Sequence, residues 1–307
     1  MEYKYPYFCR IIKILALNKK IFVIIVTYNG SKWIEKCISS VLKSSYPIDI
    51  IVIDNNSSDI SVQIIKQFQE VHLIESDENL GFGKANNLGI DLALQKNADY
   101  VFLLNQDTWI FEDTISNLVC VAENNPNFGI LSPLHFSGDG VNLDESFKTY
   151  YHRKIETGDN QNSPIVPFVN AAAWLVTKTC LEKVGQFESM FSHYGEDRNF
   201  CDRVLYHNFK IAIVQNSKIC HDRAVNRNFK KDSIQSKYSI LSKVLNINHS
   251  LFVAYLNALK SVVGLPKFFS NHYSVIKISN LFFKLMFYYI ALVFSVSVIL
   301  KKRQSFK

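Results

Sequence analysis

The amino-acid sequence predicts an α/β fold built on an open, mixed but mostly parallel sheet with helices on its faces. Apolar, β-branched runs alternate with helix-patterned segments through the first half of the chain, as they do in a parallel sheet buried on both sides. Polar clusters follow three of these runs directly. The 307 residues are 48% hydrophobic and 20% charged, a composition that excludes disorder for most of the chain.

Short, continuous apolar runs mark the expected strands. In the first half these are residues 21–27 (IFVIIVT), 48–53 (IDIIVI), 71–75 (VHLIE) and 100–104 (YVFLL). The second half is less regular, and its expected strands are residues 128–134, 164–174 and 210–214. Because helical patterns separate the first four runs, we expect those strands to pair mainly in parallel.

Apolar residues at helical spacing, or glycine-rich helix starts, mark the segments between the runs. The expected helices are residues 33–42, 61–69, 81–94 and 196–208. Residues 138–163 are polar and predict a loop.

Three polar clusters stand where expected strands end. They are Thr27-Tyr28-Asn29, the stretch from Asp54 to Asp59, and Asn105-Gln106-Asp107. In open α/β sheets the ligand lies outside the carboxyl ends of the strands. A single cluster could be a turn built from Asn and Asp, but three together predict a nucleotide site.

Two acids are candidates for chemistry at this edge. Asp107 directly follows a buried run, and magnesium is commonly held by one or two carboxylates plus phosphate oxygens. Asp197 lies in the sequence HYGED and is placed to act as a general base. Paired carboxylates at a helix start can also be dipole partners or caps, so both interpretations stay open at this point.

Six segments, in this order, resemble glycosyltransferase family 2, the inverting enzymes with the GT-A fold. They are IIVTYNG, IDNNSSD, NLGFGKANNLGI, LLNQDT, VNAAAWLVTKTCLEKVGQFESMF and HYGEDRNFCDR. The resemblance extends from Ile21 to His221. LLNQDT resembles the rhamnosyltransferase-like branch of the family.

The resemblance implies a role for each matching residue. The donor side would comprise Thr27, Tyr28, Asn29, Asp54, Asn79, Gly81, Lys84, Asn86, Asn105 and Asp107. Asp107 and His221 would hold Mg²⁺ or Mn²⁺, Asp197 would deprotonate the acceptor hydroxyl, and the acceptor side would include Trp174, Glu196 and Arg203. The chain departs from the family pattern at Asn105 and Asn199, each of which stands where an acid is common.

The resemblance implies transfer of a sugar, with inversion, from dTDP-rhamnose or a UDP-hexose. The acceptor would be a hydroxyl of a glycan or lipid-linked saccharide in surface polysaccharide synthesis. One alternative is a sugar-phosphate nucleotidyltransferase, but Tyr28-Asn29-Gly30-Ser31 is not its basic, glycine-rich phosphate loop. The other is a non-catalytic nucleotide-binding protein, which would bind donor without turnover.

The last part of the chain is basic and apolar. We expect an N-terminal segment at 1–20, a GT-A domain at 21–230 and a helical, membrane-associating tail at 231–307. Residues 251–265 predict a helix ended by Gly264 and Pro266. Residues 285–300 carry no charge and precede Lys301-Lys302-Arg303, which predicts a helix lying in a membrane interface, with basic residues on anionic headgroups. Shallow insertion, a span over residues 281–300 and packing on the catalytic domain stay open as alternatives.

The net charge and the cysteine pattern indicate the partners and the cellular location of the catalytic part. The net charge is +7, which suits an anionic partner, and without interleaved aromatic and basic residues we expect no nucleic acid. The six cysteines are scattered and form no metal or disulfide pattern. With no signal peptide expected in residues 1–20, we expect the protein at the cytoplasmic face of a membrane.

Overall fold

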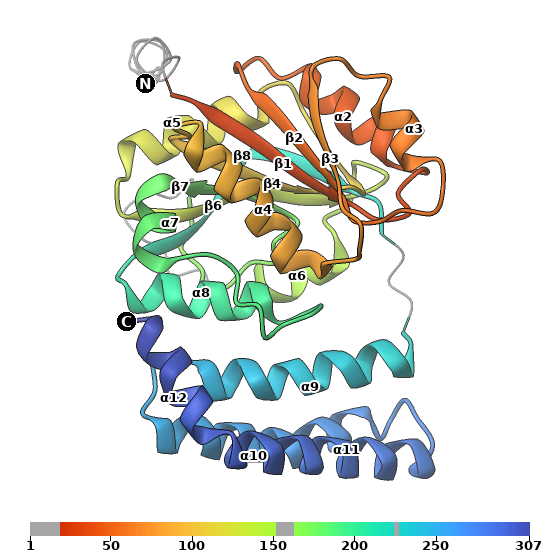
Figure 1. The fold of residues 1–307 in the computed structure, drawn as a ribbon, viewed down its shortest axis with the longest axis vertical. Coiled ribbons are helices and arrows are strands. Elements are labelled where there is room, and N and C mark those ends of the chain that lie inside the picture. The colour runs from red at the N-terminus through yellow and green to blue at the C-terminus, as the bar shows by residue number, and fades with distance from the viewer. Residues whose placement is uncertain (1–18, 152–162, 224–226) are drawn as a thin grey trace, which may run out of the picture.

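The computed structural model describes residues 19–151, 163–223 and 227–307. A sheet flanked by helices forms the larger part of the molecule, and four C-terminal helices are stacked against one side of it (Figure 1). This arrangement confirms the predicted fold class. The expectations for the N-terminal segment and for much of the 138–163 loop lie outside the described residues.

Eight strands form one mixed sheet in the order β3-β2-β1-β4-β7-β6-β8-β5. Their bounds are β1 Ile21–Thr27, β2 Asp49–Asp54, β3 Val71–Glu75, β4 Tyr100–Asn105, β5 Thr108–Ile110, β6 Phe128–Ser137, β7 Ala173–Thr177 and β8 Lys210–His221. The first four strands in sheet order are parallel, β7 is antiparallel to both neighbours, and β6 and β8 are parallel.

Seven described helices accompany the sheet and four follow it. The first group is α2 Ile34–Leu42, α3 Ser61–Ile65, α4 Gly81–Gln95, α5 Thr114–Asn124, α6 Glu145–Tyr151, α7 Lys178–Val184 and α8 Glu196–Tyr206. The second is α9 Phe229–Leu245, α10 Leu251–Phe269, α11 Val275–Phe294 and α12 Val296–Ser305.

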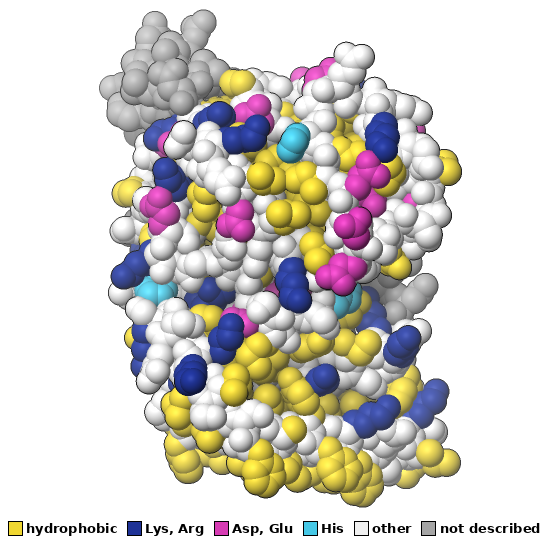
Figure 2. Space-filling view, in the orientation of Figure 1, with side chains coloured by type: hydrophobic (Ala, Val, Ile, Leu, Met, Phe, Trp, Pro, Cys, Tyr) yellow, Lys and Arg dark blue, Asp and Glu magenta, His cyan; other side chains and the backbone are white. Residues whose placement is uncertain are grey.

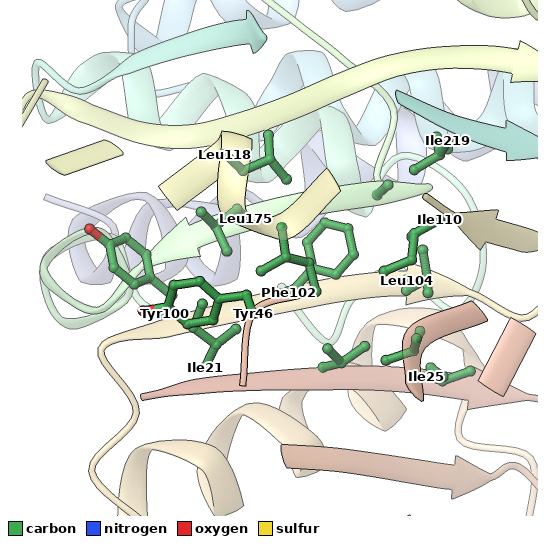
Figure 3. Packing of buried hydrophobic residues seen from close by; sticks show 14 of the residues in the cluster. Ile21, Ile25, Tyr46, Tyr100, Phe102, Leu104, Ile110, Leu118, Leu175 and Ile219 are labelled. Atoms are coloured by element: carbon green, nitrogen blue, oxygen red, sulfur yellow. The ribbon is translucent and has the colours of Figure 1, made fainter. Parts of the chain in front are cut away.

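The sheet is buried on both faces, as its apolar runs require. One core cluster joins the sheet to α2 and α5, and part of it is drawn in Figure 3. The other joins it to α4, α7 and α8. At Gly89 on α4 a Cβ would lie 2.6 Å from Ile24 Cγ2 and 3.0 Å from Ile53 Cδ1. The missing side chain therefore lets α4 approach β1 and β2 closely.

Some second-half predictions were wrong in their bounds. The strand expected at 164–174 begins only at Ala173, and the apolar Val166 and Val169 are buried outside it. Pro164 and Pro167 lack the N–H that an inner strand donates. β8 continues to His221, and the polar 138–163 segment contains α6.

The C-terminal helices also differ from the expectation. α10 continues to Phe269 through Gly264 and Pro266, so these residues do not end it. Pro266 and Phe269 are buried, and this tertiary packing compensates for the hydrogen bond that a proline removes. The 285–300 segment is not one helix, because α11 ends at Phe294 and α12 starts at Val296.

Candidate active site

The carboxyl ends of β1, β2 and β4 bring the predicted polar clusters together. In the sheet register, Thr27 lies opposite Asp54, and Val26 lies opposite Asn105. Parallel strands that end together place these side chains at one edge. The structure therefore brings Thr27, Asp54 and Asn105 to the same part of the molecule.

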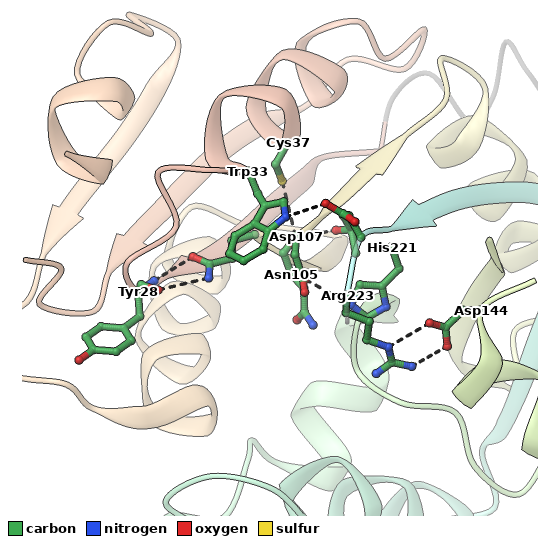
Figure 4. A network of polar contacts seen from close by, with 11 residues as sticks. Tyr28, Trp33, Cys37, Asn105, Asp107, Asp144, His221 and Arg223 are labelled. Atoms are coloured by element: carbon green, nitrogen blue, oxygen red, sulfur yellow. Dashed lines mark hydrogen bonds and ion pairs between the residues drawn. The ribbon is translucent and has the colours of Figure 1, made fainter. Parts of the chain in front are cut away.

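Gln106 holds the loop after β1 in place. Its Oε1 accepts hydrogen bonds from Thr27 Oγ1 (2.6 Å) and from the Tyr28 backbone N–H (2.9 Å). Its Nε2 donates to the Tyr28 carbonyl at 3.2 Å (Figure 4). A Cβ at Gly30 would clash with Gln106 and Thr27. The Tyr28 side chain is left 47% exposed beside this clamp.

A second loop follows β2. Asp54 Oδ2 accepts from the Ser57 N–H at 2.9 Å, whereas its buried Oδ1 has no hydrogen-bond partner among the described residues. Asn29 adopts a left-handed φ of +47°, and its Oδ1 accepts from the Ser58 N–H at 2.8 Å. The loops after β1 and β2 are thus hydrogen-bonded to each other, with one carboxylate oxygen still free for a ligand.

The start of α4 is attached to the same region. Asn79 Oδ1 accepts from Asn55 Nδ2 at 3.0 Å and from the Gly81 N–H at 2.9 Å. Gly81 has a φ of +77°, and a Cβ there would clash with the Ser192 carbonyl. On the helix itself, Lys84 is exposed. Asn86 is buried and donates to the Phe82 carbonyl at 2.9 Å, so it contacts its own helix.

Asp107 and His221 lie side by side at the end of β4 and β8. β5 pairs with β8 so that Thr108 lies opposite His221. This register brings His221 Nε2 to 3.3 Å from Asp107 Oδ1 (Figure 4). His221 is 2% exposed, and its Nδ1 has no partner among the described residues. Residues 114 positions apart in sequence thus form one polar pair.

The residues around this pair were not identified from the sequence. Trp33 Nε1 donates to Asp222 Oδ2 at 2.9 Å. Arg223 donates to both carboxylate oxygens of Asp144, its Nε lying 3.0 Å from Oδ2. Both contacts are drawn in Figure 4. Asp222 and Arg223 directly follow His221, so the stretch HDR carried a signal that a search for single motif residues overlooked.

The donor set suits a divalent cation that also binds phosphate. No group of three or more His, Cys, Asp or Glu side chains that could hold a metal occurs in the described part of the chain. Asp107 and His221 nevertheless supply one carboxylate oxygen and one imidazole nitrogen next to each other. Because magnesium usually takes few protein ligands and completes its shell with phosphate and water, these residues fit such an ion.

Glu196 and Asp197 occupy the first turn of α8. Gly195 precedes them in a left-handed conformation with φ of +92°. Glu196 is 5% exposed, and its Oε2 has no hydrogen-bond partner among the described residues. Burial, together with the negative charge of Asp197, raises the pKa of Glu196 to about 7. Burial also raises the pKa of Asp197, so both acids are less easily ionised than exposed carboxyls.

A cavity of about 1000 Å³ connects the sheet edge with the C-terminal helices. Asn105, Glu196 and Asp197 line it from the sheet side, and α9 and α10 line it from the other. Arg223 also contributes. Asp107 is not among its lining residues, although Asn105 on the same strand end is. The candidate base therefore faces the cavity, whereas neither Asp107 nor His221 lines it.

Two residues expected on the acceptor side lie in the protein interior instead of lining the cavity. Trp174 is fully buried in β7 and stacks on Phe187. Arg203 is 2% exposed. It donates to the carbonyls of Val184 (2.7 Å) and Gln186 (2.6 Å), which fixes the loop after α7 against α8.

Solved structures share this fold. TarS of S. aureus (residues 1–349, complexed with UDP-GlcNAc) has a TM-score of 0.63 and 16% identity, covering 88% of this chain and 80% of its own. The mannosyltransferase PcManGT of Pyrobaculum calidifontis, complexed with GDP-Man and Mn²⁺, has a TM-score of 0.56 and 13% identity, covering 97% and 93%. These structures confirm the GT-A-type fold predicted from the sequence.

Two proteins and one family model are similar to this chain in sequence. The hexosyltransferase Agl10 of low-salt glycan biosynthesis in Haloferax volcanii is 25% identical over 74% of this chain and 75% of its own length. The dTDP-rhamnosyl transferase RfbF of Shigella flexneri is 27% identical over 67% and 70%. The family model described as glycosyl transferase family 2 matches residues 22–185, more than half of the chain. The chain therefore belongs to glycosyl transferase family 2 and is a glycosyltransferase.

Proposed function

We propose that this glycosyltransferase moves a sugar, with inversion, from a nucleoside diphosphate donor to a hydroxyl of a glycan or lipid-linked acceptor in surface polysaccharide synthesis. The donor is dTDP-rhamnose or a UDP-hexose. One observation carries the proposal: strand ends bring Thr27, Asp54 and Asn105 to one edge, and Asn105 and Asp197 line the same cavity. The names of the two sequence relatives support the sugar classes.

The nucleotide would occupy the edge formed by β1 and β2. The exposed Tyr28 ring would stack on the base, because the Gln106 clamp fixes its backbone. The free Oδ1 of Asp54 would accept a hydrogen bond from the base or ribose. The Asn79 and Gly81 turn would close the same side of the site.

The diphosphate would lie toward Asp107. There, Asp107 and His221 would hold Mg²⁺ or Mn²⁺. Such an ion, when bound, supplies positive charge that stabilises the departing nucleoside diphosphate. Asn105 and Arg223 are near this pair in sequence and line the cavity, so they would contact the sugar or phosphate that lies between the two acids.

The acceptor hydroxyl would enter from the cavity toward Asp197. Burial raises the pKa of this carboxyl above its ordinary value, which makes the ionised form a stronger base toward an alcohol. Attack from the side opposite the leaving diphosphate inverts the anomeric centre. Glu196, in the same turn and with its Oε2 free, would hydrogen-bond the acceptor.

The variant Asp197→Asn tests this assignment. It keeps the shape of the side chain but cannot accept a proton, so transfer should fall by about a hundredfold or more while UDP or dTDP binding stays at the wild-type level. Titration calorimetry measures binding, and radiolabelled donor measures transfer. The exposed Asp77→Asn is the control. Transfer at the wild-type rate by Asp197→Asn would remove Asp197 from the role of base.

We also propose that the C-terminal helices seat the protein on the cytoplasmic face of a membrane, with a catalytic domain at 21–230 and the tail at 231–307. α10 and α11 are each long and apolar enough to cross a bilayer. Hydrophobic side chains gather over these helices at one end of the molecule (Figure 2). On α11 they include Phe287 and Phe294, which are 69% and 85% exposed.

The basic residues after α11 are divided between two environments. Arg303 is buried and donates to the carbonyls of Val244 and His249. Lys302 pairs with Glu188 at 3.0 Å, and Lys301 is exposed. Interfacial seating would therefore rely on apolar area more than on this basic run.

Vesicle flotation tests the seating. The full chain should float with anionic phospholipid vesicles and stay bound in high salt, because exposed apolar area dominates. Phe287→Glu together with Phe294→Glu should abolish flotation, whereas Ile60→Glu, at a 61% exposed position on the sheet domain, should not. Release of the wild type by salt alone would exclude insertion, and failure to float would exclude membrane seating.

A further inference from the structure

The two walls of the cavity differ in charge. On the sheet side, the acids Glu196, Asp197 and Asp202 line it together with Arg198 and Arg223. On the side of α9 and α10, Lys243 and Lys260 line it, and none of the described lining residues on those two helices is Asp or Glu. The remaining residues of that wall are mainly hydroxyl and amide side chains. A ligand that fills the cavity would meet carboxylates at one end and ammonium groups at the other.

The lysines of the helical wall lack a counter-charge. Lys243, half-buried on α9, donates to Ser261 Oγ. Within the described ranges, no carboxylate lies within 4.0 Å of the ammonium of Lys243 or Lys260. Burial and the positive charge of Arg198 lower the pKa of Lys243. A partly buried cation next to another cation is stabilised when an anion binds between them.

Arg198 completes this cluster from the opposite wall. It follows Asp197 in α8 and lines the same cavity. Its guanidinium lies 4.1 Å from the centre of the Phe168 ring, which limits its freedom to turn away. Besides Arg223, which is paired with Asp144, three cations from three helices thus border one cavity, with Arg198 directly after the candidate base in sequence.

α10 carries both a polar and an apolar face. Asn257, Lys260, Ser261 and Gly264 line the cavity. Phe252, Leu256, Leu259 and Val263 are exposed, Phe252 by 77%. Leu256, Leu259 and Val263 each immediately precede a residue that lines the cavity. One residue turns an α-helix by about 100°. The exposed apolar stripe therefore adjoins the cavity wall along the same helix.

We propose that Lys243, Lys260 and Arg198 bind the phosphate groups of a lipid-linked acceptor, whose sugar hydroxyl reaches Asp197 and whose apolar chain lies on the exposed stripe of α10. This inference rests on the proposed function, since it assumes that the acceptor enters the cavity toward Asp197. It assigns a phosphoanion site that is separate from the donor diphosphate at Asp107. It also explains why the wall facing the acids is basic.

Binding of decyl diphosphate tests the site without any sugar. Titration calorimetry uses the full chain with this probe below its critical micelle concentration, with no donor and with divalent metal removed. Lys260→Gln removes an exposed ammonium and should weaken binding about tenfold, as expected for one charge-assisted contact. The control Lys267→Gln, also exposed on α10 but outside the cavity, should bind like the wild type.

Two further measurements separate the possible sources of the signal. Inorganic pyrophosphate should bind more weakly than decyl diphosphate, and equal affinity would overturn the lipid part of the proposal. Asp107→Ala should leave decyl diphosphate binding unchanged. Binding that is lost in Asp107→Ala but kept in Lys260→Gln would place the anion at the donor site and refute the inference.

Nucleotide binding distinguishes a failure of the proposed acceptor site from a failure of the proposed donor site. Lys260→Gln should bind UDP or dTDP as the wild type does, because Lys260 lies on the helical wall. A wild type that binds neither nucleotide but binds decyl diphosphate would count against the proposed donor, not against the phosphoanion site.

Discussion

Glu196 should make the stability of the protein depend on pH. Its carboxyl is 5% exposed, with Oε2 lacking a described partner. Burial and Asp197 raise its pKa from 4.5 to about 7. In the unfolded chain the group loses its proton near its ordinary pKa, whereas the folded protein keeps that proton to about pH 7. The contribution of Glu196 to stability is therefore fully present below its pKa in the unfolded chain. It is lost as the pH rises through its pKa in the folded protein.

The size of this loss follows from the shift. A pKa unit corresponds to about 1.4 kcal/mol, so the change from 4.5 to about 7 amounts to about 3 kcal/mol above neutral pH. Glu196→Gln carries no charge at any pH and avoids this loss. The variant should match the wild type at about pH 4 and exceed its free energy of unfolding by about 3 kcal/mol at about pH 8.

Urea denaturation at the two pH values measures the effect. Because Asp197 and Asp202 also have raised pKa values, Asp202 to about 6, the wild type should lose stability from other groups as well. The difference between wild type and Glu196→Gln isolates Glu196. Glu35→Gln, an exposed substitution on α2, controls for the amide itself. An equal pH dependence in wild type and Glu196→Gln would refute the reasoning.

Two other predictions concern packing and metal binding. Gly89→Ala should destabilise the protein by about 1–3 kcal/mol in urea denaturation, because its Cβ would lie 2.6 Å from Ile24 Cγ2. Gly264→Ala, where a Cβ meets nothing within 4 Å, should be neutral or stabilise by up to about 1 kcal/mol; equal effects would contradict the close packing. Asp107→Ala should abolish the increase in UDP or dTDP affinity that Mn²⁺ gives the wild type, and a wild type whose affinity ignores Mn²⁺ and Mg²⁺ would refute the metal site.

Local sequence patterns determined the sheet and the edge that carries the candidate site. A strand buried on both faces must be apolar throughout, so runs such as IFVIIVT could be identified without structural information. Since parallel strands end on the same side, the positions of Thr27, Asp54 and Asn105 followed from strand order alone. The motif order from Ile21 to His221 then indicated the family, which the family match over residues 22–185 confirms.

Only the tertiary structure decided which of the distant residues meet. Gln106 clamps the Tyr28 loop, and His221 contacts Asp107 because β8 pairs with β5. Arg203 has motif spacing but bonds backbone carbonyls in the interior. The opposite walls of the cavity come from α8 and from α9 and α10. Such contacts depend on register, helix rotation and the packing between layers, which local periodicity does not encode.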